Sequence, residues 1–209
     1  ISTKTGADSS PPTVGVGVVL QNATNVILNN MMLRDFTNWG IWAQTLANFE
    51  LRTSTVTATG ATTNGDNAAA SEGSILLNGL TGTVTIDQCT IEKGELDNLR
   101  VINSSGVLTA MNVTNSTIGL NGTANGGDGI RLDVSGAAQA TWTANNNTFN
   151  GARSHMIEVT IAGSAQVTTT ITNNTMRDTH TNKDVNGNAV RIRALGGAAG
   201  FVANYTISN

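Results

Sequence analysis

The chain has 209 residues, of which 39% are hydrophobic, 12% charged and 4% aromatic, and its formal net charge is −3. This charge argues against a nucleic-acid partner, because no excess of basic residues is available to neutralise phosphates. Cys89 is the only cysteine, which excludes an internal disulfide, and no apolar run reaches the roughly 18 residues typical of a membrane-inserted helix.

One short motif recurs along the chain, with the pattern apolar-x-Asn-x-Thr-apolar and a further apolar residue two places earlier. A fixed unit with connections of varying length is typical of a solenoid. The copies, in chain order, are VILNNMML (26–33), FELRTSTV (49–56), VTIDQCTI (84–91), MNVTNSTI (111–118), WTANNNTF (142–149), TTITNNTM (169–176) and GFVANYTI (200–207).

The turn position of this motif is asparagine in five of the seven copies, with Thr53 and Gln88 in the other two. Asparagine both donates and accepts hydrogen bonds and tolerates unusual backbone angles. We therefore expect buried, stacked amides that form a structural Asn ladder of Asn30, Asn115, Asn146, Asn173 and Asn204.

A strand with alternating apolar residues precedes each copy, for example Ile130/Leu132 and Ile157/Val159. We call it the first strand; the second strand opens the motif, and a short third strand carries its last apolar residue. This alternation turns one side of every strand inward. The pattern predicts an all-β parallel β-helix of about seven coils, with a single domain over 14–209 and an extended N-terminal segment over 1–13.

Phrases such as GDGIRLDVSG (127–136) beside NNNTF (145–149) resemble the pectate-lyase-like right-handed parallel β-helix superfamily, closest to the repeat arrays of large bacterial surface and secreted proteins. The resemblance covers about residues 14 to 209 and implies a right-handed solenoid. It does not imply one function, because the superfamily includes lyases, hydrolases, epimerases and adhesins.

The first strands also have an outward column, in which charged residues gather in the second half of the chain. In polysaccharide-active β-helices this face carries the substrate groove, so the resemblance makes it the candidate ligand site; the alternative is that these charges pair across strands and keep the face soluble. Trp42 could stack on a sugar or be covered by residues 1–13. The candidate ligand-binding residues are Arg100, Arg131, Asp133, Glu158, Arg191, Arg193 and Trp42.

Catalysis in the resembled enzymes needs several carboxylates near such an arginine, as calcium ligands or as acid and base. The charged first strands supply only Asp133 and Glu158. We therefore assign no catalytic residue, no metal ligand and no cofactor, with calcium at the DVNGN segment (184–188) as a minor alternative. His155 and His180 have no partner at a motif spacing, and we expect them to face solvent.

The sequence thus favours a non-catalytic structural or binding module of an extracellular or cell-surface bacterial protein, with a polysaccharide or another cell-surface molecule as partner. One alternative is a polysaccharide lyase or glycoside hydrolase that acts on the first-strand face. Another is a self-assembling scaffold, because uncapped ends of a solenoid are sheet edges that can pair end to end.

Overall fold

A computed structural model describes residues 1–8, 14–122, 127–195 and 202–209. It is all-β with parallel strands in two curled sheets, and the described part contains one helix, the 3₁₀ turn Ala68–Ala70. Among the described residues, no helix has the length and apolar character needed to cross a membrane.

The smaller sheet is built from the short third strands, paired in chain order. Its members are β1 (Ser2–Lys4), β3 (Met32–Phe36), β5 (Thr55–Thr57), β7 (Thr90–Ile91), β10 (Thr117–Ile118), β13 (Thr148–Phe149) and β16 (Thr175–Met176). The N-terminal segment therefore begins as a strand of this sheet, while residues 9–13, with Pro11 and Pro12, lie outside the described residues.

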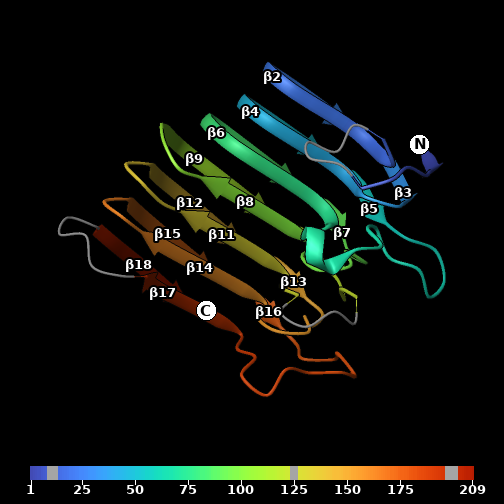
Figure 1. The fold of residues 1–209 in the computed structure, drawn as a ribbon. Helices are drawn as coiled ribbons and strands as arrows, with labels where there is room; N and C mark the ends of the chain where they lie inside the picture. The colour runs from blue at the N-terminus through green and yellow to red at the C-terminus, as the bar shows by residue number, and fades with distance from the viewer. Residues whose placement is uncertain (9–13, 123–126, 196–201) are drawn as a thin grey trace.

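The larger sheet holds the first and second strands (Figure 1). In the earlier part of the chain the two are continuous, as β2 (Val16–Asn29), β4 (Trp39–Arg52) and β6 (Gly73–Asp87). Later they separate into first strands β8 (Leu99–Asn103), β11 (Ile130–Val134), β14 (Ile157–Ala162) and β17 (Val190–Leu195), and second strands β9 (Val107–Thr114), β12 (Gln139–Asn145), β15 (Gln166–Thr172) and β18 (Val202–Ser208).

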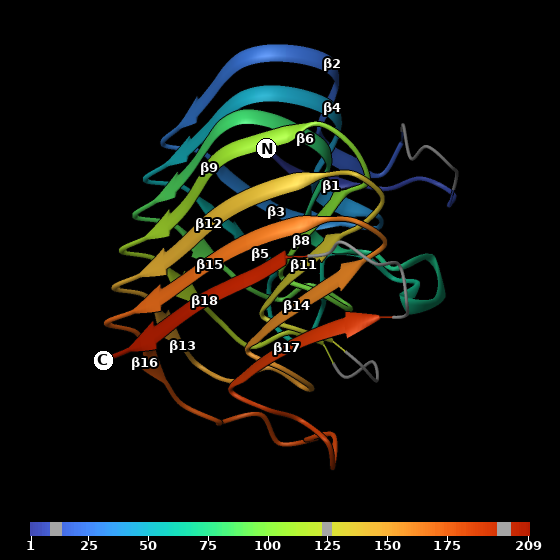
Figure 2. The same cartoon turned by 90° about the vertical axis from the view of Figure 1, so that its left-hand side faces the viewer.

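The two groups form separate stacks that both continue from β6 (Figure 2). The break between them is local: Gly106, Gly136 and Gly163 have positive φ, which glycine adopts without a Cβ penalty. In the continuous strands the bend is made by residues such as Asn22, Thr45 and Gly79, also at positive φ.

The predicted apolar columns are confirmed by the strand register. Ile41, Ile75, Leu99, Ile130 and Ile157 follow one another across paired first strands, and all are fully buried. The third strands carry a second buried column, Leu33, Val56, Ile91, Ile118 and Phe149. Burial of such side chains contributes roughly 1.5–3 kcal/mol each, so these columns are the main source of stability.

The turn asparagines are not the buried ladder that we expected. Asn30, Asn115, Asn146 and Asn173 are exposed, and each has a φ near +50°. Asparagine suits this position because it enters the left-handed region at lower cost than most residues. The Asn146 amide does bond to Asn115 Oδ1, at 2.8 Å, but on the surface.

The buried hydrogen-bonding column lies one residue later in the turn. Asn147 accepts the Ser116 main-chain N–H through Oδ1 at 2.9 Å and donates through Nδ2 to the Val113 carbonyl at 2.9 Å. Ser116 in turn accepts the Cys89 N–H, at 3.0 Å. These small polar side chains form hydrogen bonds with the inward main-chain groups. We had expected the turn asparagines, such as Asn146, to do so.

Asn204 also differs from its predicted place. β18 pairs with β15 so that Ile207 lies beside Ile171 and Asn204 beside Thr168, which is a mid-strand position. This register puts Ile207 on the same side as the buried Ile171, and a shift by one residue would turn it to the other face, although Ile207 itself is exposed on this terminal strand. Gly200, which we placed in the last copy, lies outside the described residues.

Candidate functional site

The outward column of the first strands has the predicted register. The column runs across neighbouring paired strands in the order Val19, Trp42, Leu76, Arg100, Arg131, Glu158 and Arg191. Two residues further along the strands, Asp133, Thr160 and Arg193 form a parallel column. We call the surface of Arg100, Arg131, Asp133, Arg191 and Arg193 the arginine face.

Ion pairs cross the arginine face, as the alternative interpretation predicted. Arg131 Nε lies 3.0 Å from Asp133 Oδ2, and Arg100 Nη2 lies 3.3 Å from the same oxygen. Glu158 is surrounded by guanidinium groups, with Arg193 Nε at 3.0 Å, Arg191 Nε at 3.6 Å and Arg131 Nη1 at 3.7 Å.

The arginines and Glu158 differ in their access to solvent. The Arg191 and Arg193 side chains are 38% and 32% exposed, whereas the Glu158 side chain is 4% exposed. The guanidinium groups therefore form the outer layer of this region, and the carboxylate that pairs with them lies beneath.

Three further polar residues lie buried under the arginine face, and sequence reasoning missed all three as site residues. Asp97, Asp128 and His155 each precede a first strand and are at most 3% exposed. Asp97 Oδ1 accepts the Asp128 N–H at 2.9 Å, and Asp128 Oδ1 accepts the His155 N–H at 2.8 Å. We call these residues, with Glu158, the buried polar row.

A signal for the row was present in the sequence. Asp97, Asp128 and His155 each stand two residues before the first inward residue of their strand, which is Leu99, Ile130 or Ile157. Their place just outside the alternating segment made them look like loop residues. His180 is also buried, with Nε2 3.1 Å from the Gly122 carbonyl oxygen, so the expectation of two solvent-facing histidines is wrong.

Burial raises the pKa of two acids in this row, Asp97 and Asp128. Burial raises the pKa of Asp128 to about 9, and the negative charges of Asp97 and Glu158 act in the same direction. Burial likewise raises the pKa of Asp97 to about 6, although the Asp128 N–H and the charge of Arg100 oppose the rise. At pH 7 Asp128 is therefore protonated, because a buried carboxylate beside like charges is costly.

The protonated Asp128 leaves the region with a positive balance. The ion pairs of this region join four arginines, Arg100, Arg131, Arg191 and Arg193, to only three acids, Asp97, Asp133 and Glu158. The arginines therefore outnumber the acids with which they pair, and Arg191 and Arg193 are the most exposed of them.

His155 lies between two nitrogen donors. Its Nδ1 accepts the Asn188 main-chain N–H at 3.1 Å, and Arg191 Nη1 lies 3.0 Å from Nε2. Burial lowers the pKa of His155, and the charge of Glu158 opposes this. A neutral ring can accept only one of the two hydrogen bonds, so one contact stays unsatisfied.

Two groups of side chains bring metal-binding atoms together. Asp128, His155 and Glu158, all buried, offer one atom each within 4.8 Å of one another, as do Asp8, Asp66 and Glu72 near the N-terminal end of the stack. In the second group the Glu72 carboxylate already accepts the Asp66 and Asn67 N–H groups at 2.9 and 2.8 Å. In the DVNGN segment, Asp184 Oδ1 accepts a hydrogen bond from Arg153 Nε at 3.0 Å.

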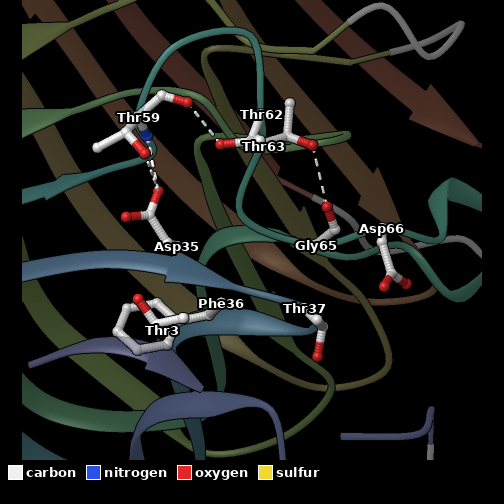
Figure 3. Close-up of a pocket in the computed structure, with 9 residues that line it drawn as sticks. All are labelled: Thr3, Asp35, Phe36, Thr37, Thr59, Thr62, Thr63, Gly65 and Asp66. Carbon is white, nitrogen blue, oxygen red and sulfur yellow. Dashed lines mark hydrogen bonds between the residues drawn. The ribbon is translucent and has the colours of Figure 1, made fainter. Parts of the chain in front are cut away.

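A hollow of about 500 Å³ lies against β3 and the 57–73 connection (Figure 3). Threonine side chains line much of it, but their hydroxyls bond within the protein: Thr59 to Asp35, Thr62 to the Thr59 carbonyl and Thr63 to the Gly65 carbonyl. These bonds hold the connection in place, and the hollow is on a different sheet from the arginine face.

Trp42 lies in the outward column but is only 5% exposed. It forms a small apolar cluster with Val16 and Trp39, against which Leu76 packs. Its ring is therefore not an open platform for a sugar, which agrees with the covering interpretation, although part of the proposed cover (9–13) lies outside the described residues.

A scan against protein-family models, a search of curated proteins and a search of solved structures each found no match to this chain.

Proposed function

We propose that the chain is a right-handed parallel β-helix of about seven coils, of the pectate-lyase-like type, and a binding module of an extracellular bacterial surface protein. Its ligand is a polysaccharide that carries carboxylate groups, and the binding surface is the arginine face. The observation that carries this proposal is the layering: exposed guanidinium ends of Arg191 and Arg193 lie above carboxyl groups that are buried. Planar guanidinium groups bind carboxylates through paired hydrogen bonds.

The same layering favours binding over catalysis. A general acid or base must come within hydrogen-bond reach of the substrate, about 2.6–3.2 Å. The carboxyl groups of Asp97, Asp128 and Glu158 are at most 4% exposed, and Asp133 is held by two arginines. Arginine keeps its proton in proteins, so the exposed groups of this face suit recognition of charge.

A polysaccharide lyase or hydrolase is the second candidate, and one specific observation favours it. The buried Asp97, which precedes its strand, adds a third acid close to Arg131, where the strands alone supply only Asp133 and Glu158. In that case ligand binding would have to move Arg131 or Arg191 and uncover an acid.

A self-assembling scaffold is the third candidate. β2 and β18 are terminal strands of the larger sheet, at opposite ends of the stack, and both expose apolar side chains such as Ile27 and Tyr205. A second copy of the chain would extend the sheet there. Sedimentation that shows only monomer at high concentration, for wild type and for Tyr205→Lys alike, would contradict this candidate.

The test is binding of polygalacturonate, a uronic-acid polymer, compared with a neutral glucan, by affinity electrophoresis and calorimetry. We expect binding of the acidic polymer only, weaker at higher ionic strength. The double variant Arg191→Gln/Arg193→Gln should lose about tenfold in affinity, equivalent to about 1.4 kcal/mol.

Arg34→Gln is the matched control, because Arg34 is an exposed arginine of the smaller sheet. It should bind as wild type does. Equal binding of both polymers, or equal affinity of the double variant, would overturn the proposal. Release of unsaturated products or reducing ends from the polymer would instead favour the enzyme.

A further inference from the structure

The buried polar row contains carboxyl oxygens without a hydrogen-bond partner. Asp128 Oδ2 and Glu158 Oε1 are both buried and unpartnered, in residues that are 1% and 3% exposed. Arg193 Nε lies 3.0 Å from Glu158 Oε1, but that oxygen makes no hydrogen bond in the structure. Buried polar atoms rarely stay without a partner in folded proteins, and a bound ion can supply one.

The third group at this place is the imidazole of His155. One atom from each of Asp128, His155 and Glu158 lies within 4.8 Å of the other two, so a single ion can reach all three after small side-chain movements. Asp128 precedes β11 and His155 precedes the paired strand β14, on which Glu158 lies. Main-chain hydrogen bonds hold Asp128 and His155 in place before any ligand arrives.

We propose that Asp128, His155 and Glu158 bind a divalent transition-metal ion of the zinc class. The donor set of one imidazole and two carboxylates suits zinc, manganese or nickel, whereas calcium prefers oxygen ligands alone. The proposal does not rest on the proposed glycan function, because its ligand atoms lie in the layer beneath the arginine face; the two sites share only Arg191.

Arg191 is the residue that has to move. Its Nη1 occupies the position next to His155 Nε2, at 3.0 Å, where the ion would bind. Its side chain is 38% exposed and borders a polar hollow of about 490 Å³ lined by residues 185–188, which gives the guanidinium group room and the ion a path. The Glu158 Oε2 atom keeps its Arg131 partner at 3.7 Å.

Asn188 can accept a hydrogen bond from the ring of a metal-bound His155. A metal on Nε2 leaves the ring proton on Nδ1, which then requires an acceptor. The Asn188 side-chain amide lies 3.3 Å from Nδ1 and can present its oxygen after a flip of the amide group, in exchange for the main-chain N–H contact.

The experiment uses the full chain, freed of metal with a chelator and dialysed against zinc, manganese or calcium. We expect about one zinc per chain, little calcium, and a melting temperature several degrees higher with zinc. Asp128→Asn should lose zinc binding at least tenfold and keep its fold, because asparagine retains the Oδ1 acceptor for the His155 N–H.

Asp178→Asn is the control, since Asp178 is a half-exposed acid paired with Lys183. It should bind zinc as wild type does. In wild-type protein, zinc should shift the ring-nitrogen NMR signals of His155 and leave those of His180 unchanged, a readout that does not depend on any variant folding. No zinc uptake, unchanged uptake in Asp128→Asn, or an unmoved His155 signal would overturn the proposal.

Discussion

The main-chain N–H of His155 donates to Oδ1 of Asp128, at 2.8 Å, although 27 residues separate the two in the chain. Asp128 in turn donates its N–H to Asp97 Oδ1, at 2.9 Å. Each buried acid thus satisfies the backbone just before the next first strand, so the residues beneath the arginine face are also part of the fold.

Two substitutions of Asp128 distinguish its role as a hydrogen-bond acceptor in the fold from its role as a buried acid. Asp128→Ala removes the acceptor of a buried N–H, which should lower the free energy of unfolding by about 1–3 kcal/mol. Asp128→Asn keeps that acceptor and resembles the protonated acid, so its stability at pH 7 should stay close to that of wild type. Urea denaturation of the metal-free proteins gives both values, and equal losses in the two variants would show that the hydrogen bond is not the relevant contact.

The two adjacent asparagines of one turn should respond differently to substitution. Asn147→Ala leaves the Ser116 N–H and the Val113 carbonyl without their partner and should cost about 1–3 kcal/mol. Asn146→Gly keeps the positive φ at no steric cost and should change stability by only a few tenths of a kcal/mol. A larger loss in Asn146→Gly than in Asn147→Ala, by thermal or chemical denaturation, would place the buried ladder where we first expected it.

Glu72 makes stability depend on pH. Burial raises the pKa of Glu72, the negative charges of Asp8 and Asp66 add to the rise, and the N–H groups of Asp66 and Asn67 oppose it. A group with a raised folded-state pKa contributes stability below its unfolded value, and this is lost as the pH rises through the folded pKa. Relative to Glu72→Gln, wild type should therefore be less stable at pH 7 than at pH 4, and denaturation of both proteins at the two pH values measures this. A gap that is the same at both values would contradict it.

Gly129 is required by the close approach of the segments that precede β11 and β14. A Cβ atom at this position would lie 2.6 Å from the Met156 carbonyl oxygen. Gly129→Ala should therefore push the start of β11 away from β14 and cost about 1–3 kcal/mol, as overpacking does. Gly60→Ser tests an open site, since nothing lies within 4 Å of a Cβ there and its φ of +59° makes strain the only cost. Comparable melting temperatures for Gly129→Ala and wild type would be inconsistent with this packing.

The alternation of apolar residues was enough to predict which side chains of each strand face inward. Leu99, Ile130 and Ile157 fall in one buried column, and Arg100, Arg131 and Glu158 in the neighbouring outward column, as the pattern indicated. This works because successive side chains of a strand point to opposite faces and the apolar set has to be buried. The composition of the arginine face could therefore be predicted.

The burial of residues outside the alternating segments could be seen only in the tertiary structure. Asparagine favours a left-handed turn wherever it occurs, so the motif alone could not show that Asn146 is exposed and Asn147 buried. In the same way, Asp128 and His155 precede their strands, and their burial follows from the segments of chain packed beside each. The sequence by itself determined the strands and their two faces through the period of two. Tertiary structure decided which turn and loop residues enter the core, because that depends on the backbone of neighbouring strands and connections.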